Sequence, residues 1–163
     1  MTAFLVETKR MTWKPHVTVA AVVEQQQRFL IVEEQTTEGF KFNQPAGHLE
    51  NGEDLMTAIR REVYEETAWQ FEPTAVIGVQ LWRRQVDAPS FIRVCFTGNV
   101  HSHNPQQPLD VGILQTHWLT LEEILSYQSR LRSPLVLNSI YRYLEGHRYP
   151  LHLLETFMDI EYG

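Results

Sequence analysis

The chain has 163 residues, of which 43% are hydrophobic and 21% charged, and its formal net charge is −6. This length suits one domain with a single sizeable core, and the composition is that of an ordinary globular protein. The negative charge argues against an extended nucleic-acid surface, which needs clustered Lys and Arg. It leaves room for one small anionic ligand, because a local cation can reverse the field.

The chain carries one cysteine, Cys95, which excludes an internal disulfide and a cysteine-based metal site. No apolar run reaches membrane-spanning length, and the first residues lack the pattern of a signal peptide. We therefore expect a cytoplasmic protein with no membrane partner. Residues 1–11 are expected to be an N-terminal arm or to follow from an upstream start.

The first half of the chain alternates strand-like and turn-like segments. The β-branched run at 16–23 predicts a buried strand, and the run at 28–34 predicts a second strand that pairs with it as a hairpin. The segment 38–53, rich in Gly, Pro and Asn, predicts a long loop with a short strand in it, and such loops are often functional. Residues 53–67 lack Gly and Pro and show helical periodicity.

In the second half, 74–84 and 90–100 predict two strands joined by a VDAP turn, and 114–119 predicts a short strand. Thr120 and Glu123 have capping-box spacing, which predicts a helix start. A last helix is expected with Ser133 as N-cap and Pro134 at its first position, ending near Gly146. The predicted fold class is α/β, a mixed sheet sandwiched by helices.

The helix predicted at 53–67 carries carboxylates beside its apolar stripe. On a helical wheel, Ile59 and Val63 belong to the stripe, and Glu62 and Glu66 lie about 40° apart at its edge. A solvated acidic face is the plain alternative, but solvated acids should lie opposite the stripe. Two partly desolvated carboxylates about 6 Å apart repel by roughly 3 kcal/mol at an effective dielectric of about 20.

One neighbouring cation cannot neutralise this cluster. Arg61 precedes Glu65 by four residues and is placed to brace it, but Glu62 and Glu66 also need compensation. A divalent cation can supply it, and oxygen-only ligands favour Mg²⁺ or Mn²⁺ over zinc. Gly47, in the preceding loop, lets a backbone carbonyl approach the same ion closely. The residues thus predict a metal-dependent site that acts on a small phosphorylated molecule.

The segment 47–69, GHLENGEDLMTAIRREVYEETAW, resembles the Nudix box, which reads Gly, five residues, Glu, seven residues, then Arg-Glu-aliphatic-x-Glu-Glu-x-Gly-apolar. The positions that match in residue and spacing are Gly47, Glu53, Arg61, Glu62, Val63, Glu65 and Glu66. Ala68 replaces the family's glycine, where φ is often positive, at an expected cost of about 1 kcal/mol. Segments from about residue 12 to residue 152 are also similar to NudJ-type phosphatases of this family.

The resemblance implies a Nudix-type α/β/α sandwich over 12–152, with a catalytic loop-helix-loop and a C-terminal tail at 153–163. It implies hydrolysis, with Mg²⁺ (Mn²⁺ possible), of nucleoside tri- and diphosphates or a related diphosphate, such as the hydroxymethylpyrimidine diphosphate of thiamine metabolism, with release of phosphate. The alternatives are a Nudix pyrophosphatase for a nucleotide sugar or dinucleoside polyphosphate, and a non-catalytic nucleotide sensor. A monomer or small homo-oligomer is expected.

The resemblance also assigns roles to residues. Glu62, Glu65 and Glu66 are the catalytic candidates, and they join the Gly47 carbonyl as metal ligands, with Glu53 and Arg61 in support. Outside the box the family uses a further acid, for which Asp110 is the candidate, with loop capping as its alternative role. From residue type and position, the other substrate-binding candidates are Phe42, Asn43, Gln44, Trp82 and Arg93. Core packing is the alternative for the aromatic rings, and an exposed surface position is the alternative for Arg93.

Overall fold

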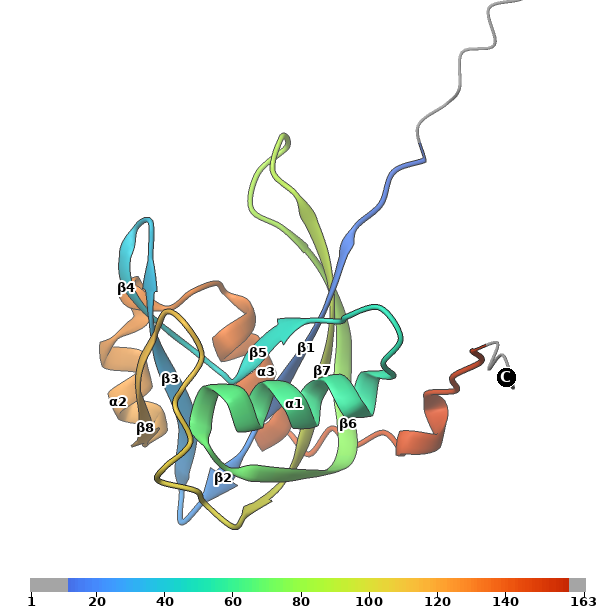
Figure 1. Cartoon of the computed structure of the whole chain (residues 1–163). Helices are drawn as coiled ribbons and strands as arrows, with labels where there is room; N and C mark the ends of the chain where they lie inside the picture. Colours follow the sequence, from blue (N-terminus) through green and yellow to red (C-terminus); the bar gives the residue numbers. More distant parts are fainter. Residues whose placement is uncertain (1–11, 159–163) are drawn as a thin grey trace, which may run out of the picture.

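A computed structural model describes residues 12–158 as two sheets enclosed by helices (Figure 1). The predicted arm at 1–11 and residues 159–163 of the predicted tail lie outside the described residues. The elements are β1 (His16–Val22), β2 (Glu24–Gln25), β3 (Arg28–Thr36), β4 (Gly39–Asn43), β5 (Ala46–His48), α1 (Leu55–Thr67), β6 (Gln70–Arg83), β7 (Ser90–His101), β8 (Ile113–Leu119), α2 (Leu121–Ser126), η1 (Gln128–Arg130), α3 (Leu135–Leu144) and η2 (Leu151–Leu153).

The first sheet is mixed and has the strand order β5-β1-β7-β6, with β1 parallel to β7 and antiparallel to β5. The second sheet is antiparallel; it runs β2-β3-β4, and β8 pairs with β3. The predicted hairpin between 16–23 and 28–34 is therefore wrong. The short β2 pairs with the start of β3, while β1 finds its partners far along the chain.

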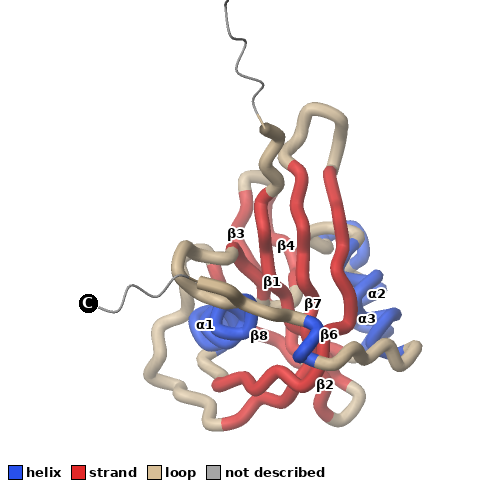
Figure 2. The backbone as a smooth tube through the Cα atoms, turned by 90° about the vertical axis from the view of Figure 1, so that its right-hand side faces the viewer, coloured by secondary structure: helices blue, strands red, loops and turns tan. Residues whose placement is uncertain are grey.

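Helices cover both faces of the strands, as expected of an α/β/α sandwich. Figure 2 shows α1 on one side and α2 and α3 on the other. Alternate residues of β1 point to opposite faces: Val19 belongs to the core cluster that contains Ile59 of α1, and Ala20 to the cluster that contains Ile140 of α3. The two apolar clusters fix α1 against the sheet, and with it the predicted site.

The helix ends follow the capping signals closely. α1 begins one residue later than Asp54, whose side chain accepts a hydrogen bond from the Thr57 N–H, and ends at Ala68, where φ is 60°. The capping box of Thr120 and Glu123 is present at the start of α2. The predicted start of α3 is confirmed to within one residue. Leu135 is the first helical residue, and Pro134 before it already has a helical backbone. The Ser133 hydroxyl accepts a hydrogen bond of 3.3 Å from the Leu135 N–H, as expected of a cap.

Other strand predictions need only changes of boundary. The predicted loop at 38–53 contains two strands, β4 and β5, and β6 begins at residue 70, four residues before the predicted start at 74. The β6–β7 hairpin is confirmed, with Arg83 opposite Ser90 next to the turn. In Figure 1 this hairpin projects beyond α1. Within residues 12–158, no helix is long and apolar enough to cross a membrane.

Candidate active site

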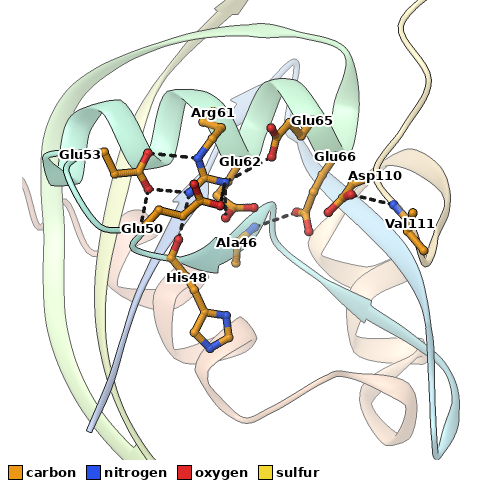
Figure 3. A network of polar contacts seen from close by, with 10 residues as sticks. All are labelled: Ala46, His48, Glu50, Glu53, Arg61, Glu62, Glu65, Glu66, Asp110 and Val111. Carbon is orange, nitrogen blue, oxygen red and sulfur yellow. Dashed lines mark hydrogen bonds and ion pairs between the residues drawn. The ribbon is translucent and has the colours of Figure 1, made fainter. Parts of the chain in front are cut away.

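Two glutamates of α1 are turned inward beneath β5. Glu62 and Glu66 are each 7% exposed, as their position beside the apolar stripe predicts. The Glu66 carboxylate accepts a hydrogen bond of 2.8 Å from the Ala46 N–H on β5 (Figure 3). The solvated-face alternative is therefore wrong for these two residues, which lie between the helix and the glycine loop.

The Glu62 carboxylate lies directly against the backbone of Gly47. A Cβ added at Gly47 would lie 2.1 Å from the Glu62 carboxyl carbon. No side chain fits at that distance without moving the strand or the carboxylate. The glycine is thus needed for close approach of the loop backbone to the acidic cluster.

Arg61 holds the acidic side chains and the loop together (Figure 3). Its guanidinium bonds both oxygens of Glu53, at 2.6 and 3.0 Å, and donates to the His48 carbonyl at 3.0 Å. It also donates to Glu62 at 2.8 Å and to Glu65 at 3.2 Å. Glu53 and Glu62 raise the pKa of Arg61, the Glu53 hydrogen bond being the largest cause. Arg61 and Glu53 therefore lie where a supporting role requires them.

Burial makes the charged forms of Glu62 and Glu66 less favourable. Burial raises the pKa of Glu66 well above its usual range, and the charges of Glu62, Glu34 and Asp110 add to this, while the Ala46 hydrogen bond opposes it. Burial also raises the pKa of Glu62, against the lowering effect of Arg61. Clustered groups with shifted pKa values are typical of functional sites.

Asp110 lies near the end of α1 that carries Glu65. Its N–H donates to the Glu65 carbonyl at 2.8 Å, and its carboxylate accepts from the Val111 N–H at 2.8 Å. The second bond is the loop-capping role expected as the alternative. The Asp110 charge also contributes to the raised pKa of Glu66, so the residue belongs to the edge of the acidic cluster as well.

A cleft of about 410 Å³ opens beside Gly47 and continues along the β6–β7 hairpin. Three of the predicted substrate-binding residues line it: Asn43, Trp82 and Arg93. Arg93 is only 5% exposed and donates to the Asn43 side chain at 3.3 Å. Burial lowers its pKa. The surface-arginine alternative is therefore wrong, and a buried guanidinium with few partners faces the cleft.

Phe42 and Gln44 point the other way, because alternate residues of a strand face opposite sides. The Phe42 ring is 4% exposed and packs in the core, 4.6 Å from the Tyr127 ring. Gln44 is 1% exposed and donates to the Val136 carbonyl of α3 at 2.8 Å. Their predicted contact with substrate is corrected to core packing and anchoring of the loop.

Glu34 of β3 also lines the cleft, and no motif or spacing in the sequence indicated it. Burial raises its pKa, and Arg132 and Arg93 act to lower it. Its neighbour Glu33 bonds Arg130 instead. The pair looks like an ordinary charged strand end, and only the paired sheet shows which glutamate faces inward.

The donor set of the acidic cluster fits a hard divalent cation. It offers carboxylates and a backbone carbonyl beside a glycine that leaves space. Over residues 12–158, no three His, Cys, Asp or Glu side chains lie close enough together to hold an ion as they stand. Arg61 engages both Glu62 and Glu65, so metal binding requires these side chains to turn away from it.

Comparison with known proteins identifies the family to which the chain belongs. A sequence profile of the NUDIX domain matches residues 14–138. The chain belongs to the NUDIX family. It is 43% identical over 145 residues to Phosphatase NudJ of Escherichia coli K12 and of Shigella flexneri, a match that covers 89% of this chain and 94% of each relative. A NUDIX hydrolase from Nitrosomonas europaea superposes with a TM-score of 0.86 and 43% identity, over 88% of this chain and 98% of that chain.

The Nudix chain is thus a NudJ-like hydrolase acting on phosphoanhydride bonds. More distant structures share the fold alone. One is the NUDIX domain of Shewanella oneidensis NrtR in complex with ADP ribose, at 19% identity and a TM-score of 0.66 over 82% of this chain and 89% of that chain. Nudix hydrolases generally use a divalent metal.

Proposed function

We propose that this chain is an Mg²⁺-dependent phosphohydrolase, able to use Mn²⁺, that releases phosphate from nucleoside tri- and diphosphates. A related small diphosphate, such as hydroxymethylpyrimidine diphosphate, is the other substrate in the proposal. One observation carries it: the Glu62 and Glu66 carboxylates are buried against Ala46 and Gly47 of β5, and these two residues also line the cleft that contains Arg93.

In this proposal the ligands of the ion come from the Gly47 carbonyl, Glu62, Glu65 and Glu66. Such an ion neutralises the phosphates and acidifies a bound water. The chain supplies the remaining functions. Arg93 donates hydrogen bonds to phosphate oxygens, and a carboxylate of the cluster that holds no ion accepts the proton of the attacking water. Arg61 and Glu53 keep the loop in place, Trp82 offers a face for a ring to stack on, and Asp110 is a further acid at the edge.

We propose that residues 12–152 form the catalytic domain and that it works in the reducing cytoplasm as a monomer or small homo-oligomer. Cys95 is free and buried, which accords with a structural thiol in such a compartment.

Phosphate release from a nucleotide panel with Mg²⁺ or Mn²⁺ tests the assignment. Glu66→Gln should lower kcat/KM by about 100-fold or more, because it removes a carboxylate from the centre. Glu72→Gln is the control, since Glu72 forms an exposed ion pair with Arg60 away from the cleft. Unchanged release in Glu66→Gln would overturn the centre. Pyrophosphate or a nucleoside monophosphate as the product, in place of free phosphate, would favour a pyrophosphatase.

A further inference from the structure

Glu34 lies in the cleft, but neither the metal cluster nor the phosphate chemistry uses it. It comes from β3, in the second sheet, while Arg93 comes from β7 in the first. Both line the same cleft, together with Asn43. The Glu34 side chain is 20% exposed, so its carboxylate is largely desolvated and reachable from the cleft.

The two oxygens of this carboxylate differ in their surroundings. Oε1 is closed off from solvent, forms an ion pair with Arg132 Nε at 3.2 Å, and has no hydrogen-bond donor among residues 12–158. The exposed part of the side chain is therefore the rest of the carboxylate. Buried and half-buried polar groups are nearly always hydrogen-bonded in native proteins. A carboxylate in a ligand cleft that is held on one oxygen keeps acceptor capacity for a donor on the ligand.

The other residues of the cleft indicate which kind of hydrogen-bond donor a ligand would place beside Glu34. A phosphate group offers acceptors and negative charge, so it belongs beside Arg93 and not beside the Glu34 oxygen. The rings of Trp82 and Phe91 line the same cleft with centroids 5.9 Å apart. Aromatic faces of this kind stack on flat heterocycles. A ring that carries an exocyclic amino group would satisfy both features at once.

We propose that Glu34 is a specificity-determining residue that accepts a hydrogen bond from an amino group on the heterocyclic ring of the substrate. The preferred substrates are phosphorylated compounds with an aminated ring, and the corresponding oxo rings are disfavoured. Their carbonyl oxygen would face the Glu34 carboxylate, acceptor against acceptor. This inference rests on the proposed function, because it reads the cleft as the substrate site.

Two substrate pairs differ in the relevant group: CTP against UTP, and ATP against ITP. In each pair an amino group replaces an oxo group. The wild type should prefer the amino member by about tenfold or more in kcat/KM, since a site built to bond a donor rejects the analogue that lacks it. Glu34→Gln, which presents both an acceptor and a donor, should remove or reverse this preference. Glu34→Asp should still prefer the amino substrate, but by a smaller factor in kcat/KM.

Glu33→Gln is the matched control. Glu33 is the preceding residue of β3, but it bonds Arg130 at 2.9 Å and His117 at 3.0 Å and does not line the cleft. The Glu33→Gln variant should therefore keep the preference for the amino substrates. Melting temperatures of all variants identify any that lose activity by misfolding, and nucleotide binding by calorimetry measures the preference in those that fold but turn over slowly.

Equal use of amino and oxo substrates by the wild type would overturn the inference, and so would a preference that Glu34→Gln leaves unchanged. An effect of Glu34→Gln that disappears with 2′-deoxynucleotides would assign the contact to a ribose hydroxyl and also overturn it. If no nucleotide is hydrolysed with Mg²⁺, the proposed function fails. The same amino and oxo pairs in the calorimeter then decide the inference on Glu34 separately.

Discussion

Gly47 and Glu62 show how one missing side chain creates room for a reactive group. The space that a Cβ of residue 47 would fill is occupied by the Glu62 carboxylate at 2.1 Å. The same close approach brings the loop backbone beside the acidic cluster. At this position, therefore, the requirement for glycine is steric and local, and it is not a matter of turn conformation.

Gly47→Ala should therefore damage the site more than the fold. The new methyl group must displace the Glu62 carboxylate or the strand, which should lower kcat/KM by about 100-fold and the free energy of unfolding by about 1 to 3 kcal/mol. Steady-state kinetics and urea denaturation measure the two effects.

The double variant Gly47→Ala/Glu62→Ala provides the control. Removing the carboxylate opens the space that the methyl group needs, so the two changes should not add in the free energy of unfolding. Activity should stay lost. Strict additivity of the two losses in stability would contradict the proposed contact.

Which residues could be predicted depends on how local their signals are. Glu62 and Glu66 were predictable because the apolar stripe and the spacing of the box are properties of one helix. Phe42 and Gln44 were misjudged, and Glu34 was missed. Whether a strand residue faces the core or the cleft depends on partners such as α3 and η1, far along the chain.

At the scale of elements, α1 and the loop before it act as one unit fastened by Arg61. One guanidinium joins the loop, through Glu53 and the His48 carbonyl, to Glu62 and Glu65 of the helix. The planar fork of arginine makes such divided bonding possible, and lysine lacks it. The fixed loop is what places Gly47 over the cluster.

Arg61→Ala should lower the free energy of unfolding by about 2 kcal/mol, because charged hydrogen bonds are lost, and should lower kcat/KM by at least about tenfold. Arg61→Lys should recover little of either. The neighbouring Arg60 gives a matched comparison, since its exposed ion pair with Glu72 is worth less than about 1 kcal/mol. Equal losses in Arg60→Ala and Arg61→Ala, by chemical denaturation and kinetics, would argue against the fastening role.

The elements themselves were largely predictable, but their pairing was not. Helical periodicity predicted α1 and a capping box predicted the start of α2, each to within a residue or two, and the β6–β7 hairpin followed from its turn. The predicted hairpin of the first two strands failed. β1 is held by β7, more than 70 residues away, at Val17↔Ile92, and a short-range turn signal cannot report such a pairing.

For the whole molecule, the buried carboxylates make stability depend on pH in a defined direction. Glu66 has a raised pKa in the folded chain, so it keeps its proton where the unfolded chain has lost it. Its contribution to stability is therefore present below its ordinary value of 4.5 and is lost as the pH rises through the folded pKa. Glu62 and Glu34 act in the same direction. Glu53 and Asp54 act in the opposite direction, because their pKa values are lowered in the folded chain: their contribution to stability is present above their ordinary pKa values and is lost as the pH falls through the folded values.

A cation that binds the charged cluster should offset this loss. Ligands that bind only the folded state raise the melting temperature by mass action, and binding to a carboxylate requires that its proton leave. Mg²⁺ should accordingly stabilise the protein much more at about pH 8 than at about pH 5. Glu66→Gln, which carries no titrating proton, should show a smaller fall of stability with pH and a smaller response to Mg²⁺.

Thermal unfolding of the wild type and of Glu66→Gln, with and without Mg²⁺ at these two pH values, tests most directly whether the buried glutamates hold a cation. Mg²⁺ should raise the melting temperature of the wild type at the higher pH and leave that of Glu66→Gln nearly unchanged. A wild type that does not respond to Mg²⁺ or Mn²⁺, or a variant that responds equally, would contradict this claim.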